Sequence, residues 1–131
     1  VLTYGSNCTI AEAAVAELAN LGVDVELIDA QSLIPFDIEK EVSKSLQKTN
    51  TLIIIDEDVR GGGSAFLMQN ILEDQEGYRY LDSAPTTITS KDHRPAFASD
   101  GDYFSKPSLD DMIEGIYAVM HEKDPAKYPA I

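Results

Sequence analysis

The chain has 131 residues, of which 44% are hydrophobic, and this is enough to build one compact domain with a genuine core. Its 23 Asp and Glu residues outnumber 10 Lys and Arg, and the net charge of -13 argues against a nucleic-acid partner, because affinity for phosphate backbones comes mainly from clustered Lys and Arg. A single cysteine, Cys8, excludes an internal disulfide framework and a thiol cluster for zinc or for iron and sulfur.

The sequence also bears on location and partners. No stretch approaches the roughly 20 apolar residues of a membrane span, and the start carries no basic segment followed by an apolar one. With its lone cysteine, the chain is expected in a reducing cytoplasm. It opens with Val1 inside an apparent strand, so we expect a fragment of a longer polypeptide. An acidic surface suits a basic partner, but acidic charge also serves solubility alone, and both interpretations stay open.

The first third of the chain predicts a strand, a helix and a second strand. Residues Val1–Tyr4 are typical of a short strand. A helix is expected to begin at Thr9, which could form a capping box with Glu12, and to stop at Gly22, because glycine adopts the left-handed conformation easily. Residues Val23–Ile28 alternate apolar and acidic side chains and then become fully apolar, which indicates a strand with one partly exposed end.

The middle third repeats this alternation. Asp37 is predicted to be the N-cap of a second helix with apolar residues on one side. The uninterrupted apolar run Leu52–Ile55 predicts a central strand covered on both faces. After the acids Asp56–Asp58 and three glycines, Ser64 is expected to cap a third helix.

The last third predicts one more strand and one more helix. Residues Thr86–Thr89 indicate the strand, and Lys91–Pro107 read as a loop of mixed polarity. Ser108 and Asp111 predict a cap for the last helix. The tail Glu122–Ile131 is expected to be ordered only if a partner holds it.

The alternation of strands and helices predicts the fold class. About four strand-to-helix repeats, with no internal repeat or linker, indicate a single α/β domain over residues 1–131. We expect a three-layer α/β/α sandwich around a largely parallel sheet of about four to five strands with right-handed crossovers.

Loops that follow strands are the first places to look for a binding site in such a fold. The loop Gly5–Thr9 could present amides to an anion at a helix start, but it lacks a Gly-x-Gly-x-x-Gly fingerprint and a nearby cation, so an ordinary turn is favoured. Gly61–Gly63 beside Arg60 resembles a phosphate nest, yet the preceding acids would repel phosphate. Close packing of two backbones, such as across a subunit interface, is the favoured role of these glycines.

No set of side chains amounts to a strong catalytic site. The acids Asp56–Asp58 could hold a divalent metal, but a second converging cluster of oxygen ligands is missing. Cys8 lies near a helix N-terminus, a position that can lower the pKa of a thiol, without an identifiable base. His93 could contact a ligand or a partner, whereas His121 is explained as a cation at a helix end. The sequence therefore predicts no catalytic, cofactor-binding or metal-binding residue in this chain.

Several segments, taken in order, resemble one protein family. The matching segments are Leu2–Gly5, Val25–Asp37, Ser45–Asp58 with the glycines that follow, Ala84–Pro85 and Asp92–Pro95. They resemble the T-Y-G, V-I-D-L-R-T-L-x-P-x-D, S-V-x-K-T, A-P-V and D-x-P elements of the transketolase C-terminal domain. The likeness is closest to the beta subunit, or beta-like half, of the thiamine-dependent decarboxylase component of 2-oxo acid dehydrogenase complexes of the pyruvate or branched-chain type.

The chain also departs from the family pattern. Gln31 stands where the family usually has arginine, and Ala65-Phe66 replaces a small residue followed by glutamate. An extra residue after Asp92 shifts the proline, and the loop that follows is longer. These departures suggest a divergent branch, such as one in which alpha and beta regions are fused in a single chain.

The resemblance implies that the chemistry takes place elsewhere. In this family, thiamine diphosphate and magnesium lie between the alpha subunit and the N-terminal half of the beta subunit, and the acyl group passes to a lipoyl group. The C-terminal domain helps to form the beta dimer and docks the basic peripheral domain of the lipoyl acyltransferase. The expected partners are thus an alpha subunit or alpha-like half, a second beta copy and the acyltransferase, and the fragment itself is expected to bind no cofactor and to be inactive.

Three alternatives remain at this point. The chain could be the matching domain of a transketolase or deoxyxylulose phosphate synthase. It could instead be an independent flavodoxin-like module that binds a ligand through Asp56–Asp58 or the glycine loop. It could also be an acidic interaction domain unrelated to thiamine enzymes.

Overall fold

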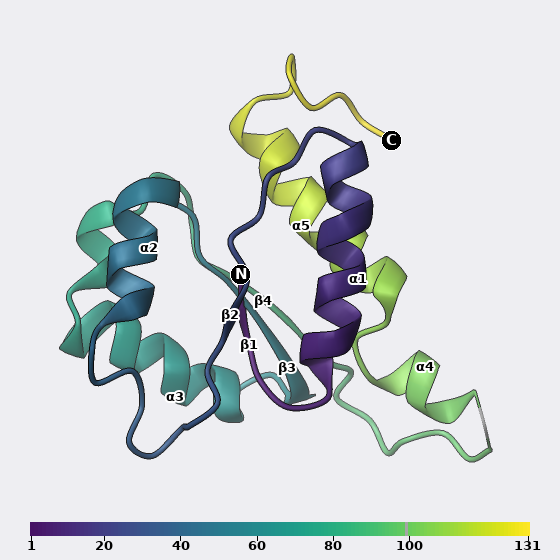
Figure 1. Cartoon of the computed structure of the whole chain (residues 1–131). Helices are drawn as coiled ribbons and strands as arrows, with labels where there is room; N and C mark the ends of the chain where they lie inside the picture. The colour runs from purple at the N-terminus through teal and green to yellow at the C-terminus, as the bar shows by residue number, and fades with distance from the viewer. Residues whose placement is uncertain (99) are drawn as a thin grey trace.

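Four short parallel strands form the centre of the molecule, and helices cover both faces (Figure 1). The computed structural model describes residues 1–98 and 100–131. The strands are β1 (Leu2–Thr3), β2 (Ile28–Asp29), β3 (Ile53–Val59) and β4 (Thr86–Ser90). The helices are α1 (Asn7–Asn20), α2 (Glu41–Thr49), α3 (Gly63–Gln69), α4 (Gly101–Ser105) and α5 (Leu109–Lys123), with a π-helical turn η1 (Asn70–Asp74) and a 3₁₀ turn η2 (Gly77–Tyr80).

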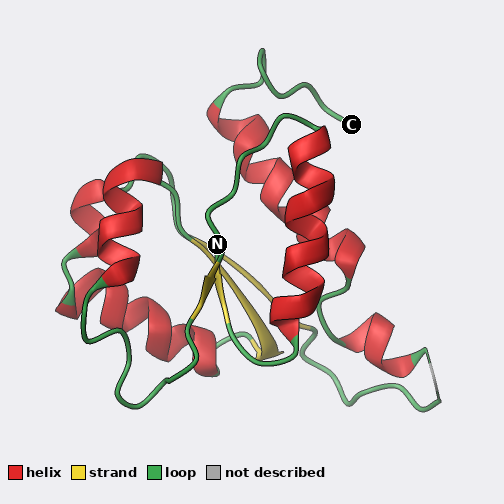
Figure 2. Cartoon of the chain, viewed as in Figure 1, coloured by secondary structure: helices red, strands yellow, loops and turns green. Residues whose placement is uncertain are grey.

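The sheet has the order β2-β1-β3-β4, and every pair of neighbours is parallel. Leu2 pairs with Ile28 on one side and with Ile54 on the other. Figure 2 shows the strands between two groups of helices. This arrangement confirms the predicted three-layer α/β fold with a parallel sheet, here of four strands.

The apolar run of β3 supplies both halves of the core. Ile53 and Ile55 pack in the cluster formed with α1 and α5, whereas Ile54 packs in the cluster formed with α2 and α3. Successive residues of a strand point to opposite faces, so a run of three isoleucines can serve two layers at once. Ile54 and Ile55 are fully buried. The sequence therefore predicted the central position of this strand correctly.

The start of α1 differs from the prediction. The helix begins at Asn7, and its N-cap Ser6 makes no side-chain capping bond, so Thr9 lies inside the first turn and the predicted capping box with Glu12 is wrong. The turn before the helix fixes this earlier start, because the Cys8 amide donates to the Gly5 carbonyl. The predicted stop is confirmed, since Gly22 has a φ of 77° in the left-handed region.

The second strand is much shorter than the predicted Val23–Ile28 segment. Only Ile28–Asp29 pairs, because the neighbouring β1 is itself two residues long. The preceding residues Val25 and Leu27 still pack against the α1–α5 core. The alternating apolar residues of this segment are therefore explained by burial of one side of the chain, although the segment is not hydrogen-bonded as part of the sheet.

Neither Asp37 nor Ser64 occupies the N-cap position that the sequence predicts for it. α2 begins at Glu41, yet the Asp37 carboxylate accepts hydrogen bonds from the amides of Glu41 (2.8 Å) and Val42 (3.0 Å), so Asp37 does stabilise the helix start. α3 begins at Gly63, and Ser64 is its second residue without a side-chain cap, so the predicted role of Ser64 is wrong.

The C-terminal region confirms one prediction and corrects two. Ser108 and Asp111 form the predicted capping box at the start of α5. The segment predicted as a plain loop, Lys91–Pro107, contains the short helix α4, and its residue 99 lies outside the described residues.

The tail was expected to need a partner, but it packs on α5 of the same chain. Tyr128 is buried, its ring lies edge-on to Tyr117 at 6.3 Å, and the Tyr117 hydroxyl donates to the Pro129 carbonyl. In the part of the chain that the structure covers, no helix combines the length and apolar character needed to cross a bilayer.

Candidate functional site

Tyr4, the residue after β1, and Asp56, in the middle of β3, meet near the C-terminal end of the parallel sheet, the end where ligands of parallel α/β folds bind. The Asp56 side chain is completely buried. Its Oδ1 accepts from the Tyr4 hydroxyl (2.6 Å) and the Asp58 amide (3.0 Å), and its Oδ2 accepts from the Ser64 amide (2.6 Å). A buried carboxylate needs such donors to offset its lost hydration, and here all of them come from the chain itself.

The glycine loop Gly61–Gly63 allows the start of α3 to pack closely against Tyr4 and Asp56. A β-carbon at Gly63 would lie 2.6 Å from the Tyr4 hydroxyl oxygen and 3.2 Å from Asp56 Oδ2, and one at Gly62 would collide with the Asp58 side chain. Gly61 has a φ of 95°, which strains any other residue. The glycines therefore let the start of α3 close over the carboxylate. These glycines do serve close packing as predicted, but their neighbours are side chains of the same chain and not a second backbone.

Tyr4 is held in its protonated form by this environment. Burial raises the pKa of the Tyr4 phenol, and the hydrogen bond to Asp56 together with the charges of the neighbouring acids raises it further. The phenol thus acts as a stable hydrogen-bond donor to Asp56. It is poorly suited to act as a base.

Glu57, the next acid along β3, joins the surrounding loops. Its carboxylate accepts from the Ser6 hydroxyl (3.0 Å) and lies 3.8 Å from the Lys106 ammonium. Its carbonyl accepts a short hydrogen bond from the Ser90 hydroxyl. The segments after β1, β3 and β4 are thereby tied to one another.

The remaining candidates do not form a reaction centre with these acids. Burial raises the pKa of the Cys8 thiol, and a hydrogen bond with Asp29 raises it further, so the lowering considered for a helix N-terminus is wrong here. His93 Nδ1 lies 2.8 Å from the Arg94 carbonyl oxygen in an exposed loop. His121 Nδ1 lies 2.6 Å from the Tyr128 carbonyl oxygen, which places it in the contact between α5 and the tail.

Asp56 and its donors Tyr4, Asp58 and Ser64 hold β1, β3 and α3 together, and we call this set the clamp. Within residues 1–98 and 100–131, no three His, Cys, Asp or Glu side chains converge as a metal ion would require. The oxygens of Asp56 are already engaged by internal donors. The sequence singled out Asp56 but gave no sign of Tyr4 as its partner, because 52 residues separate them.

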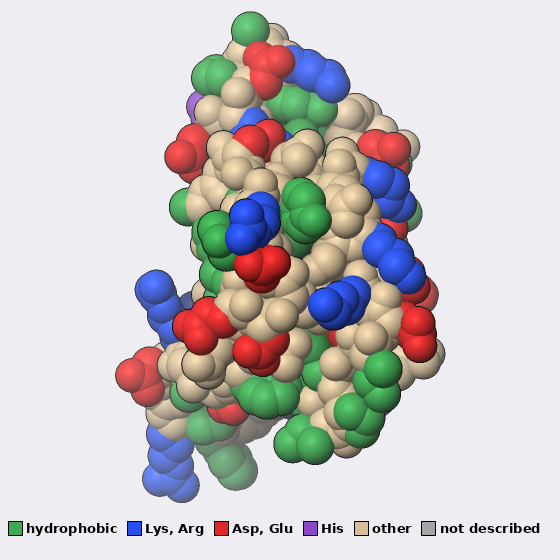
Figure 3. All heavy atoms as spheres, turned by 90° about the vertical axis from the view of Figure 1, so that its left-hand side faces the viewer, with side chains coloured by type: hydrophobic (Ala, Val, Ile, Leu, Met, Phe, Trp, Pro, Cys, Tyr) green, Lys and Arg blue, Asp and Glu red, His purple; other side chains and the backbone are tan. Residues whose placement is uncertain are grey.

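Charge is distributed unequally between the two helical layers. α1 and α5 together carry six Asp or Glu and one Lys, namely Glu12, Glu17, Asp110, Asp111, Glu114, Glu122 and Lys123. The opposite layer of α2, α3, η1 and η2 carries three acids and three cations, and Figure 3 shows both signs interspersed on that side. We call the exposed acids of α1 and α5 the acidic face. The helices of this layer thus carry an excess of five negative charges over Lys and Arg, whereas the charges of the opposite layer balance.

Comparison with known proteins identifies similar chains. The family model described as "Transketolase, C-terminal domain" matches residues 1–106. The pyruvate dehydrogenase E1 component subunit beta of Mesostigma viride is 30% identical over 123 residues, covering 94% of this chain and 37% of that protein. The same subunit of Rhizobium meliloti (strain 1021) is 27% identical, covering 93% and 26%. The 2-oxoisovalerate dehydrogenase subunit beta of Pseudomonas aeruginosa is 32% identical over 108 residues, covering 82% and 29%. The chain thus spans between about a quarter and two fifths of these relatives.

Replacing the central carboxylate is expected to destabilise the fold strongly. Asp56→Ala leaves the Tyr4 hydroxyl and the Ser64 amide without their acceptor, and we expect the free energy of unfolding to fall by about 3 kcal/mol. Asp58→Ala is the matched control, because the Asp58 side chain is exposed, and it should cost less than about 1 kcal/mol. Urea unfolding of both variants measures the difference. Equal losses would show that the clamp is not a main source of stability.

The raised pKa of Tyr4 predicts a pH dependence in alkali. Above about pH 10 the unfolded chain loses the phenol proton while the folded chain keeps it, so folding stability falls as pH rises. Tyr4→Phe should remove this part of the slope, whereas Tyr78→Phe, at an exposed tyrosine, should leave it in place. The measurement is unfolding by urea between pH 8 and pH 11, and the same slope in wild type and Tyr4→Phe would contradict the assignment.

Proposed function

Since the chain belongs to the transketolase C-terminal domain family, we propose that it is the assembly and partner-docking domain of the decarboxylase component of a 2-oxo acid dehydrogenase complex. Residues 1–131 would form one domain of a longer polypeptide. That polypeptide would assemble with an alpha subunit or alpha-like half and with a second beta copy, in the cytoplasm. The full enzyme would decarboxylate a 2-oxo acid oxidatively and pass the acyl group to a lipoyl group.

The cofactors of that reaction are placed outside this domain in the proposal. Thiamine diphosphate and magnesium supply the decarboxylation chemistry when they are bound. Magnesium requires several oxygen ligands that converge, whereas Asp56, the one carboxylate buried among the described residues, already accepts from Tyr4, Asp58 and Ser64. The residues present therefore do not fit a thiamine diphosphate and magnesium site within the described residues, which is why the proposal places both outside this domain.

The acidic face is the observation that carries the docking proposal. A surface with six acids and one lysine attracts a basic partner, steers its approach and fixes its orientation. The partner we assign is the basic peripheral domain of the lipoyl acyltransferase, as the family resemblance implies. A surface kept acidic for solubility alone would not need this difference between the two layers.

The isolated chain is expected to have no decarboxylase activity. Supplied with thiamine diphosphate and magnesium, it should release no carbon dioxide from pyruvate or from 2-oxoisovalerate, because the groups that bind the cofactor lie elsewhere in the proposal. Carbon dioxide release is measured directly, with an intact decarboxylase as the positive control. Turnover by the pure chain would refute the placement of the reaction outside this domain.

Docking is tested by reversing charge on each helical layer. Glu12→Lys with Glu17→Lys changes the acidic face, and Glu73→Lys with Asp74→Lys makes the same change of charge on η1. All four positions are exposed. Titration calorimetry with the peripheral domain of the organism's own acyltransferase should show about tenfold weaker binding for the first pair and little change for the second. Equal effects of the two pairs, or no binding to wild type, would contradict the proposal.

A further inference from the structure

The strand β4 lies at one edge of the sheet and leaves part of its backbone free. The Thr86 amide donates to the Leu52 carbonyl, so the backbone groups of Thr86 and Ile88 point toward β3. In a parallel ladder the intervening residues direct both N–H and C=O to the other side. The amides and carbonyls of Thr87 and Thr89 therefore point away from the sheet, where a further strand could bind them.

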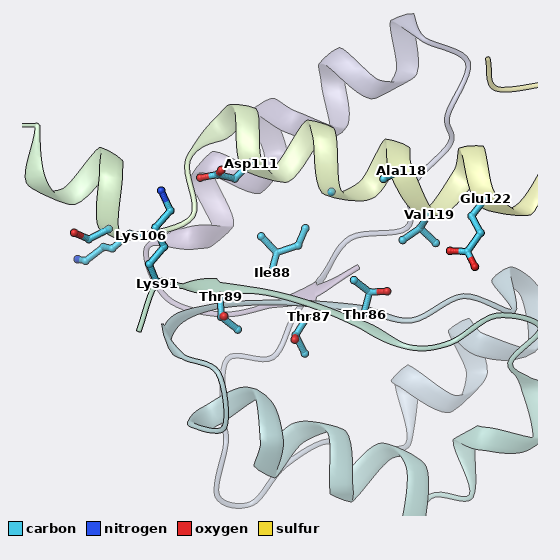
Figure 4. A pocket seen from close by; sticks show the side chains of 12 residues that line it. Thr86, Thr87, Ile88, Thr89, Lys91, Lys106, Asp111, Ala118, Val119 and Glu122 are labelled. Atoms are coloured by element: carbon cyan, nitrogen blue, oxygen red, sulfur yellow. The ribbon is translucent and has the colours of Figure 1, made fainter. Parts of the chain in front are cut away.

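A groove runs along this edge on the side of α5 (Figure 4). Its volume is about 550 Å³, and its floor is made by Ile88 of β4 together with Gly115, Ala118 and Val119 of α5. The groove exists because two of these helix residues are small: a β-carbon at Gly115 would lie 2.7 Å from the end of the Ile88 side chain, and Ala118 is exposed. An apolar side chain entering the groove would fill this space.

A second groove flanks the same edge on the side of α3. It has a volume of about 250 Å³ and is lined by Arg60, Ala65, Met68 and Thr87 among others. Successive side chains of a strand point to opposite faces. A strand added beside β4 would therefore place alternate side chains in the α5 groove and in the α3 groove.

We propose that the β4 edge is a peptide-binding site that takes an extended segment of a partner protein as a fifth strand, with an apolar side chain over Gly115 and Ala118 and an acidic residue at the end of the groove beside Lys91 and Lys106. Strand addition of this kind takes its affinity from main-chain hydrogen bonds to the outward groups of Thr87 and Thr89. Its specificity comes from the pockets that receive alternate side chains.

Local charge indicates an acidic residue at one end of the incoming segment. Lys91, Lys106 and Arg60 line the two grooves together with the acids Asp111 and Glu122. The Asp111 carboxylate accepts from Ser108 in the capping box of α5, and Glu122 lies at the opposite end of the α5 groove from the two lysines (Figure 4), so a carboxylate is best accepted beside Lys91 and Lys106.

Lys91 and Lys106 lie together at one end of the α5 groove in Figure 4. Both ammonium groups are exposed and weakly engaged, at 3.8 Å from the Phe104 ring centroid and 3.8 Å from Glu57 Oε2 respectively. A carboxylate of the incoming strand could replace these contacts.

A second copy of this chain is a poorer fit to the grooves. It would offer the same short threonines of β4, and the same Gly115 and Ala118, whose small size creates the empty space. Two copies would also bring together chains that each carry a net charge of -13. Apart from Ile88, whose side chain already forms the floor of the α5 groove, β4 carries only Thr and Ser side chains, so the site instead suits longer apolar side chains from a different protein. The acidic face meets this site only at Asp111 and Glu122, which line the α5 groove, whereas its acids Glu12 and Glu17 on α1 line neither groove.

The test begins with an unbiased selection of peptides. A phage library of random peptides of about twelve residues is selected on the 131-residue chain, and the enriched peptides are synthesised and titrated by fluorescence anisotropy. We expect them to alternate apolar residues with others and to carry an acidic residue near one end. Failure to enrich any peptide would overturn the proposal. The acyltransferase is absent from this experiment, so failure here leaves the docking proposal standing.

Two variants locate the binding. Ala118→Leu fills the α5 groove from an exposed position, and Ala16→Leu makes the same change at an exposed position of α1. Thr87→Pro removes an outward amide, which an edge strand tolerates. We expect Ala118→Leu and Thr87→Pro to weaken peptide binding about tenfold, and Ala16→Leu to leave it unchanged.

The same variants separate this occupant from a second copy of the chain. Equal affinity for wild type and Ala118→Leu would overturn the site. So would a dimer of the wild-type chain that Thr87→Pro dissociates in analytical ultracentrifugation, because a second copy would then occupy the edge. Unchanged thermal unfolding of Ala118→Leu shows that its loss of binding is not a loss of fold.

Discussion

The buried carboxylate of Asp56 is the interaction on which the rest of the structure depends. It joins β3 to the residue after β1 through the Tyr4 hydroxyl, and to the start of α3 through the Ser64 amide. These bonds require Gly63 to pack without a side chain against the same two groups. One side chain thereby sets the position of two strands, a glycine loop and a helix. An isolated charge in this place would be costly to bury, so the three donors and the carboxylate are needed together.

This clamp lies near the C-terminal end of the parallel sheet, where parallel α/β proteins bind their ligands. The two surfaces that we propose to bind partners lie on the outside of the layers. One is the acidic face of α1 and α5, which opposes a layer of balanced charge. The other is the edge of β4 with its two grooves. Both are proposed to bind macromolecules, which accords with similarity to subunits of pyruvate and 2-oxoisovalerate dehydrogenases.

The sequence predicted those elements whose signals are local. The apolar run of β3 and the capping box of Ser108 and Asp111 needed no knowledge of distant residues. Other predictions failed where a long-range partner decides the outcome, although the capping box expected of Thr9 and Glu12 is a local signal that also failed. β2 stops where β1 stops, and Ser64 yields its expected capping role to the Asp56 carboxylate, which reaches the helix start from eight residues away. Tyr4 could not be paired with Asp56 from the sequence, because only the parallel arrangement of β1 and β3 brings them together.

The claim that the clamp closes the ligand-binding end of the sheet is tested most directly by titrating the isolated chain with magnesium, flavin mononucleotide and adenine nucleotides. Two-dimensional NMR would follow the amides of Asp58 and Ser64, which donate to the Asp56 carboxylate. The account predicts that neither amide signal shifts in a saturable way with any of these ligands. Saturable shifts of both amides with any one of them would show that Asp56 belongs to a ligand site and would contradict the account.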